Sequence, residues 1–295
     1  RERSTSFIIG PMPHGETLFP AIGIDVVAAL CEARDVDSDE RAYLAAHRSH
    51  EVIHLLRRWR LIARKADLQV VSLAGGGNNP LLGLSNRHPV PGKGLYLSAG
   101  IHGDEPAAVQ GLLQWAENNV QSLRELPVAI FPCLNPWGLS NNRREDAEGR
   151  DLNRSFDRPG IPVIGAMLDF ISGRDFAVAV NLHEDFDANG MYVYELARQG
   201  ESLGEDLLER VEGVIPRHQG GVEGRIPKNG VMRRTRGLMK IVREIGGMPE
   251  SIYLFLNGAR TALTFETPSE YSLYRRVQCH IRFLEGVVDL IGPGG

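Results

Sequence analysis

The spacing of hydrophobic positions changes near residue 67. Before it, residues 21–34 and 39–66 carry apolar side chains at helical intervals with many charges between them, a pattern that predicts amphipathic helices. After it, short apolar runs alternate with turn-forming residues, beginning with residues 68–73. The pattern therefore predicts two parts: a helical N-terminal extension, residues 1–66, packed on the core, and a main domain, residues 67–295.

The main domain shows alternating strand and helix patterns. Several runs rich in apolar residues predict strands: residues 94–98, 128–131, 176–182, 191–195 and 261–265. Longer segments with helical spacing lie between or after them: residues 105–120, 203–214 and 270–290. Residues 135–158 are polar and predict a long loop. Strands in which apolar and polar residues hardly alternate are typical of sheets covered on both faces. We therefore expect an α/β fold with a mixed, largely parallel twisted sheet sandwiched between helices.

Composition narrows the possible partners. The 295 residues carry a formal net charge of −4, which argues against a nucleic-acid binder. No apolar run reaches the roughly 18–20 residues of a membrane span, so we also expect no membrane partner.

The three cysteines are far apart and form no CxxC pair, which favours a reducing compartment. We expect a cytoplasmic location, with a trimmed signal before Arg1 left open. The oligomeric state is left open.

Ionisable residues follow three of the predicted strands. His102 and Glu105 come after residues 94–98, His183 follows 176–182, and Glu266 ends the late strand. Ligand sites in such sheets lie at the carboxyl ends of the strands. Two imidazoles and one carboxylate form a three-ligand zinc set with a fourth position free, as in catalytic zinc sites. Since His102 and Glu105 are three residues apart at a strand-to-helix turn, both can reach one metal ion.

Five short motifs occur in a fixed order and resemble the zinc carboxypeptidase family of the carboxypeptidase A and B type. They are H-G-D-E at 102–105, N-P-W-G at 135–138, R-x8-N-R at 144–154, L-H-E-D at 182–185 and F-E-T-P at 265–268. The resemblance includes the murein-peptide amidase branch and the succinylglutamate desuccinylase and aspartoacylase branch. It covers roughly residues 94–290, while the first 65 residues match no family pattern.

The resemblance implies roles for residues of the site. One zinc ion per chain would be held by His102, Glu105 and His183. Glu266 matches the general base that takes a proton from the attacking water and passes it to the leaving amine. Arg144 matches the arginine that stabilises the tetrahedral oxyanion.

Further residues of the resemblance concern the substrate. Asn153 and Arg154 match the pair that binds its terminal carboxylate, for which the planar guanidinium fork is suited. Arg143 is the alternative to Arg144, because a one-residue gap would exchange them. Tyr253 is the candidate for the family's mobile tyrosine, although it lies closer to Glu266 than that pattern suggests.

Some features near the motifs depart from the family or admit two interpretations. Trp137 stands where carboxypeptidases usually hold Asp or Asn. Glu184 and Asp185, which flank His183, are equally well interpreted as partners that orient an imidazole or as solvated loop carboxylates. The basic segment 233–243 is interpreted as an exposed face near the cleft.

The sequence thus predicts a zinc-dependent metallocarboxypeptidase that hydrolyses an amide bond next to a free C-terminal carboxylate, with cell-wall-type peptides among the candidate substrates. The first alternative is an N-acyl-amino-acid deacylase of the desuccinylase and aspartoacylase type. The second is an inactive metal-binding scaffold, against which the presence of Glu266 argues. The expected partner is accordingly a peptide or an N-acyl amino acid. The side-chain preference and the L or D configuration of the substrate are left open.

Overall fold

The structure, a computed structural model, describes residues 38–75, 79–92, 94–234 and 236–291. Residues 42–295 form one compact unit, and residues 1–41 are assigned to another. The helix predicted at residues 21–34 lies outside the described residues. The prediction that residues 1–66 form an extension packed on the core stays a prediction. Within the described ranges, no helix is long and apolar enough to cross a membrane.

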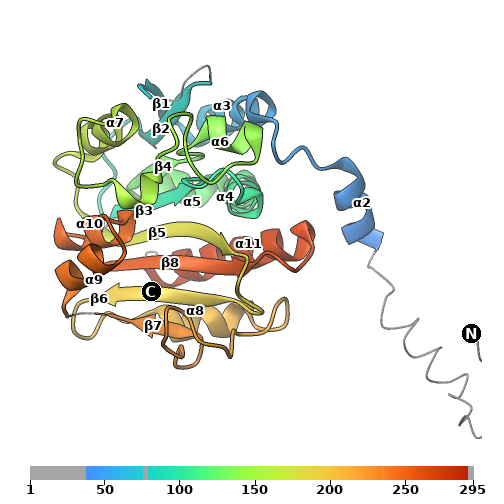
Figure 1. The fold of residues 1–295 in the computed structure, drawn as a ribbon. Helices are drawn as coiled ribbons and strands as arrows, with labels where there is room; N and C mark the ends of the chain where they lie inside the picture. Colours follow the sequence, from blue (N-terminus) through green and yellow to red (C-terminus); the bar gives the residue numbers. More distant parts are fainter. Residues whose placement is uncertain (1–37, 76–78, 93, 235, 292–295) are drawn as a thin grey trace, which may run out of the picture. The chain divides into compact units, whose positions relative to one another are not determined.

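A single mixed sheet forms the centre of the compact unit (Figure 1). Its strands in spatial order are β1 (Leu68–Leu73), β2 (Leu81–Asn86), β4 (Val128–Phe131), β3 (Gly94–Ala99), β5 (Phe176–Asp185), β8 (Thr261–Pro268), β6 (Tyr192–Ala197) and β7 (Val231–Arg233). The central strands β4, β3, β5 and β8 run parallel, as do β6 and β7. The pairings β1–β2, β2–β4 and β8–β6 are antiparallel. The predicted α/β fold with a mixed, largely parallel sheet is confirmed.

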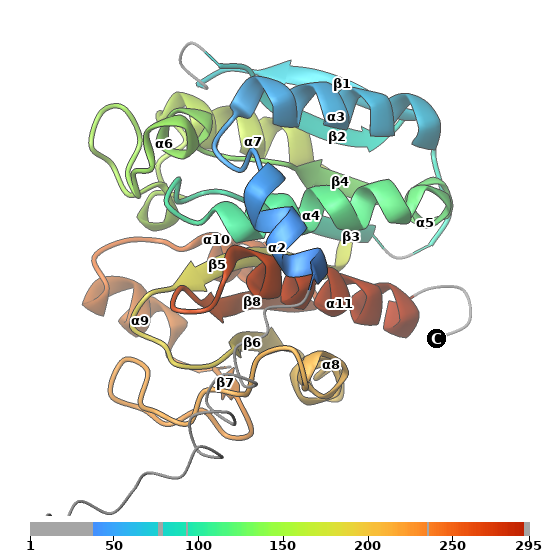
Figure 2. The ribbon, with the colours of Figure 1, turned by 90° about the vertical axis from the view of Figure 1, so that its right-hand side faces the viewer.

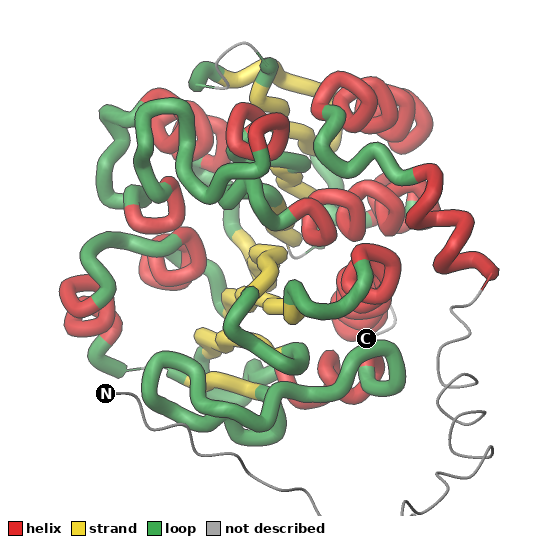
Figure 3. Tube along the Cα trace, turned by 45° about the vertical axis from the view of Figure 1, so that its right-hand side comes forward, coloured by secondary structure: helices red, strands yellow, loops and turns green. Residues whose placement is uncertain are grey.

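Helices cover both faces of this sheet (Figures 2 and 3). One face carries α3 (Val52–Ala66), α4 (Pro106–Asn118), α5 (Val120–Glu125), α8 (Gly204–Val211) and α11 (Leu273–Ile291). The other carries α7 (Pro162–Ile171), α9 (Leu238–Glu244) and α10 (Glu250–Leu256). Alternate residues of one strand enter the two cores: Leu95 and Leu97 pack on the first side and Tyr96 on the second. Both faces are therefore buried, as the continuous apolar runs predict.

The helical and loop predictions need three corrections. The segment 39–66 is two helices, α2 (Ser38–Ala46) and α3, and Asp67 ends α3 in a left-handed conformation. The predicted loop 135–158 contains α6 (Pro136–Asn141) and a 3₁₀ turn, Leu152–Arg154. The side chain of Asn135 accepts a hydrogen bond from Gly138 N and so caps α6. Strand β2 and helices α7, α9 and α10 are not expected from the pattern, because they are short and lack a clear period.

The parallel strands bring the predicted site residues to one edge of the sheet. Ala99 at the end of β3 pairs with Leu182 of β5, and His183 pairs with Glu266 of β8. Helix α4 begins at Pro106, directly after Glu105, with proline in the first turn, where its missing N–H costs nothing. The carboxyl ends of β3, β5 and β8 therefore surround a common point.

Candidate metal centre

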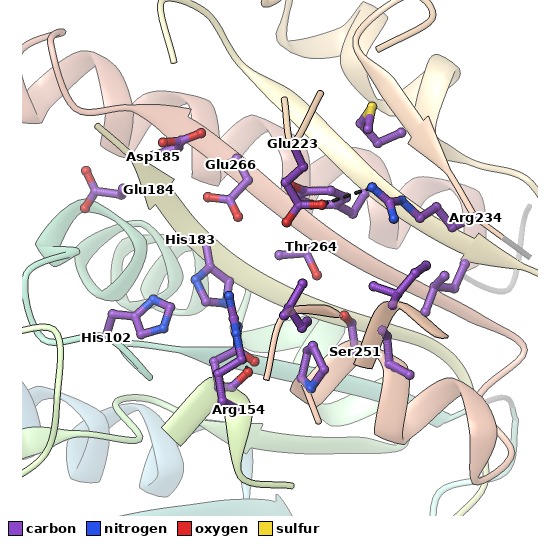
Figure 4. Close-up of a pocket in the computed structure, with 18 of the residues that line it drawn as sticks. His102, Arg154, His183, Glu184, Asp185, Glu223, Arg234, Ser251, Thr264 and Glu266 are labelled. Atoms are coloured by element: carbon purple, nitrogen blue, oxygen red, sulfur yellow. Dashed lines mark hydrogen bonds and ion pairs between the residues drawn. The ribbon is translucent and has the colours of Figure 1, made fainter. Parts of the chain in front are cut away.

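His102, Glu105 and His183 form one buried cluster. Each offers a ligand atom, and these atoms lie within 4.8 Å of one another. The distance from His102 Nδ1 to Glu105 Oε1 is 2.5 Å, and that from His183 Nδ1 to Glu105 Oε2 is 2.9 Å. Figure 4 shows the two imidazoles on the same side of the cavity. The structure thus brings together the three residues that the sequence nominates as ligands.

The chemistry of the cluster fits a metal ion. Glu105 Oε2 is fully buried, and among the described residues no donor meets it with hydrogen-bond geometry, although His183 Nδ1 lies 2.9 Å away. A buried, unsatisfied carboxylate oxygen is costly in a protein interior. Coordination of a cation by Glu105 and the two facing ring nitrogens would remove that cost.

The charges of the cluster shift the pKa values of its members. Burial opposes the charged form of His102, but the charge of Glu105 and a hydrogen bond with Asp151 raise its pKa to about 9. Burial would raise the pKa of Glu105, yet the two facing histidines lower it to about 2. These opposite shifts favour a protonated imidazole beside an ionised carboxylate.

Asp151 and Arg144 complete one wall of the cluster. The second ring nitrogen of His102 lies 3.3 Å from Asp151 Oδ1, and Arg144 Nη2 donates to Asp151 Oδ2 at 2.9 Å. Arg144 Nη1 lies 3.9 Å from Glu105 Oε1. A carboxylate on the outer nitrogen of a ligand histidine fixes the ring orientation. Asp151 was not among the predicted site residues, although it lies within the segment between Arg144 and Arg154.

Glu266 lies beside the cluster on β8. Its position pairs with His183 on β5, and both line the same cavity (Figure 4). Burial raises the pKa of Glu266 to about 8, the charge of His183 opposes this shift, and the charges of Glu105 and Asp185 add to it. Asp185 in turn accepts a hydrogen bond from Tyr192 at 2.7 Å. Glu266 is thus a carboxyl group that can hold a proton near neutral pH.

Asn153 and Arg154 both line the cavity. Asn153 Oδ1 accepts from the backbone N–H of Glu250 at 2.9 Å, so this side chain holds the start of α10. Arg154 Nη1 donates to the backbone oxygen of Asn153 at 2.9 Å. A methyl group on Gly247 would come within 2.0 Å of the Arg154 backbone oxygen. Only glycine permits this approach, which fixes the 3₁₀ turn carrying both residues.

Arg143 and Tyr253 are not placed in the cavity. Arg143 has an exposed side chain, while its neighbour Arg144 lines the cavity. Tyr253 lies on α10 and packs against Phe156 with ring centroids 6.0 Å apart. Of the two candidate arginines, the structure therefore brings Arg144 to the site.

Part of the basic segment 233–243 is not the exposed face that the sequence suggests. Arg234 lines the cavity, with its side chain 12% exposed, and pairs with Glu223 at 3.0 Å (Figure 4). Arg233 pairs with the buried Glu195 at 2.7 Å. Both acidic partners are distant in sequence, so no local pattern could have indicated these contacts.

Comparison with known proteins agrees with this site. Residues 91–159 match the family described as Succinylglutamate desuccinylase/Aspartoacylase catalytic domain. This segment contains His102, Glu105, Arg144 and the Asn153–Arg154 pair. A search of curated proteins found no match.

Solved structures share the fold. A candidate metallopeptidase from Shewanella amazonensis SB2B has a TM-score of 0.71 at 20% identity over 83% of this chain and 95% of its own. A metallo-carboxypeptidase from Burkholderia cenocepacia gives 0.57 at 15% identity over 79% and 67%. One from Pseudomonas aeruginosa, in complex with (2-guanidinoethylmercapto)succinic acid, gives 0.56 at 17% identity over 80% and 68%.

The family match and the His–Glu–His cluster together support a metal-dependent amide hydrolase. The solved structures show that the fold is shared. The resemblance of the chain to the zinc carboxypeptidase family, with its desuccinylase and aspartoacylase branch, is thereby confirmed.

Proposed function

We propose that the protein is a zinc-dependent metallocarboxypeptidase that hydrolyses an amide bond next to a free carboxylate. The observation that carries this proposal is the shared cavity: the His102–Glu105–His183 cluster, Glu266 and Arg154 all line it. A metal cluster, a proton carrier and a carboxylate-binding cation within one cavity are the parts that this reaction needs.

Zinc is the metal that suits two imidazoles and one carboxylate with a further position free. One ion per chain would be held by His102, Glu105 and His183. When bound, zinc supplies Lewis acidity to the amide carbonyl and lowers the pKa of water towards about 7. The cluster is buried, and Asp151 lies 3.3 Å from the second ring nitrogen of His102, where it can orient that ligand.

Glu266 and Arg144 would act on the reacting groups. The Glu266 carboxylate accepts a proton from the attacking water and donates it to the nitrogen of the leaving amine. Glu266 lines the cavity beside the metal cluster, within reach of a group that must both lose and gain a proton. Arg144, oriented by Asp151, presents a fixed positive charge to the oxyanion that develops on the carbonyl oxygen.

Arg154 would bind the free carboxylate of the substrate. Among the described residues, its side chain donates one hydrogen bond, to the Asn153 backbone oxygen, and leaves further N–H groups for a ligand. Five N–H donors in a planar fork match a carboxylate in two parallel hydrogen bonds. Asn153 supports this arrangement by holding the loop against α10.

The second candidate is an N-acyl-amino-acid deacylase. The match of residues 91–159 to the Succinylglutamate desuccinylase/Aspartoacylase catalytic domain favours it. The same metal cluster, base and arginines would serve that reaction, since it also cleaves an amide next to a free carboxylate. The two candidates differ in what lies on the acyl side of the bond: a peptide or a small acyl group.

A substrate panel tests these candidates. Zinc-loaded protein is incubated with peptides bearing free or amidated C-termini, including cell-wall-type peptides, and with N-acyl amino acids, and released amines are quantified. Release of C-terminal residues from peptides supports the carboxypeptidase. Turnover of N-acyl amino acids alone supports the deacylase. Zinc binding without turnover of any substrate would favour a metal-binding scaffold.

A further inference from the structure

Glu184 is a buried carboxylate next to the proposed ligand His183. Its side chain is 0% exposed. Glu184 borders the same cavity as His183. Because successive side chains of a strand point to opposite faces, its carboxylate leaves β5 on the other side, towards α4 and α11. Figure 4 shows its carboxylate directed away from that of Glu266. The mechanism above does not use this group, and a fully buried charge requires an explanation.

One oxygen of Glu184 holds the start of helix α4. Oε1 accepts a hydrogen bond from the backbone N–H of Ala107 at 2.5 Å. Glu105, the N-cap residue of α4, makes no capping hydrogen bond with its own side chain. Glu184 therefore supplies from β5 the acceptor that a capping side chain normally supplies locally. Its negative charge also suits a helix N-terminus.

The other oxygen of Glu184 pairs with Arg276 of α11. Arg276 is 13% exposed and also donates to the backbone oxygen of Tyr271 at 2.9 Å. The pair compensates the buried charge of Glu184 and fixes the direction of its carboxylate. Three elements thus meet at one side chain: β5, α4 and α11.

Helices α4 and α11 approach closely beside this pair. One turn after Arg276, His280 packs so near Gly111 of α4 that a methyl group there would come within 2.3 Å of its Cβ. The ring of His280 lies 3.1 Å from the hydroxyl of Thr267, the neighbour of Glu266. The same face of α11 therefore supports the strand ends that carry His183 and Glu266.

From these contacts we propose that Glu184, held by Arg276, is a positioning residue that sets the distance between His183 and the His102–Glu105 turn. Glu184 directly follows the proposed ligand His183 in the chain. Its side chain binds the backbone N–H of Ala107, two residues after the proposed ligand Glu105. Loss of this link would let α4 shift relative to β5, so the three ligand atoms would no longer converge. This inference rests on the proposed metal centre and adds the means by which that centre is assembled.

Cobalt titration of the full chain tests the proposal, because the visible absorption of Co²⁺ reports both affinity and coordination geometry. Glu184→Gln keeps an oxygen for Ala107 N–H but loses the charge that pairs with Arg276, and Glu184→Leu loses both. The matched control is Arg210→Met, which removes the exposed α8–α11 ion pair with Asp289. Thermal unfolding of each metal-free variant separates positioning from general destabilisation.

For Glu184→Leu we expect cobalt affinity to fall about 10- to 100-fold, with an altered spectrum, at a temperature where the variant is folded. Glu184→Gln should lie between it and the wild type, and Arg210→Met should match the wild type. Both Glu184 variants binding cobalt within twofold of the wild type, with its spectrum, would overturn the proposal even if their unfolding temperatures drop. A wild type that binds no metal would instead overturn the proposed function, and this inference with it.

Discussion

His183 and Glu266 occupy paired positions on the adjacent parallel strands β5 and β8. One is a proposed metal ligand and the other the proposed base, so the sheet register itself sets the base beside the metal centre. A one-residue slip of β8 would turn Glu266 to the opposite face and bring Phe265 or Thr267 into its place. The relationship therefore depends on strand pairing rather than on a flexible loop.

Glu266→Gln should separate chemistry from metal binding. The amide has nearly the same shape but cannot accept a proton from water. We expect turnover to fall on the order of 10²–10⁴-fold, the usual contribution of a general base. Steady-state kinetics on the best substrate, with metal content of the same sample as the control, measures this. A Glu266→Gln enzyme with near-normal turnover would show that another group moves the proton.

His183→Ala should remove the metal. Without this imidazole, two ligands remain, which is too few for a stable zinc site. Metal analysis of protein purified with equimolar zinc should give about one ion per chain for the wild type and strongly reduced zinc for the variant. The matched control is His88→Ala, since His88 is exposed and outside the cluster. Full zinc in His183→Ala would contradict the assignment.

The strand ends and the metal cluster follow from local patterns. Residues 128–131 form β4 as predicted, because an apolar run this short, ended by a proline, is too short for a buried helix and fits a buried strand. His102 and Glu105 could be predicted as ligands because they are only three positions apart at a strand-to-helix turn, so their side chains can reach the same metal ion.

Contacts across the sequence could not be predicted. Asp151 reaches His102 across 49 residues, and Arg276 reaches Glu184 across 92. Arg234 lines the cavity, where its side chain pairs with Glu223 and is largely withdrawn from solvent. A charged residue in a linear pattern looks the same whether it is solvated or paired, so such roles require the tertiary structure.

Metal binding should strengthen as pH rises from about 6 to 9. In the metal-free chain the pKa of His102 is raised from 6.5 to about 9, so at neutral pH a proton must leave when metal enters. Apparent affinity should then rise up to about tenfold per pH unit for each proton released. Calorimetric titration in two buffers of different ionisation enthalpy counts these protons. Binding without proton release at pH 7 would contradict the prediction.

The stability of the metal-free protein should change in the opposite direction. Folding raises the pKa of His102 from 6.5 to about 9, so the folded state binds this proton more tightly than the unfolded state. The resulting contribution to the free energy of unfolding is complete below pH 6.5 and is lost as the pH rises through about 9. The raised pKa of Glu266, from 4.5 to about 8, acts in the same direction at lower pH. The unfolding temperature of chelator-treated protein should therefore fall between pH 6.5 and 9, while the gap to the zinc-loaded protein widens. Equal gaps at both ends of this range would count against the linkage.

Arg154 should determine the requirement for a free carboxylate. Its guanidinium lines the cavity beside Asn153, and a ligand carboxylate would satisfy its remaining donors. Capping the substrate as an amide removes the charge and one acceptor oxygen, so the wild type should lose most activity on it. Arg154→Lys should raise KM for the free acid, because a point charge cannot make two parallel hydrogen bonds. In Arg154→Ala the preference for acid over amide should largely vanish.

Arg143→Ala, which alters an exposed arginine nearby, should keep that preference. Equal cleavage of capped and free substrates by the wild type would exclude a carboxypeptidase and leave a metal-dependent amidase of another specificity.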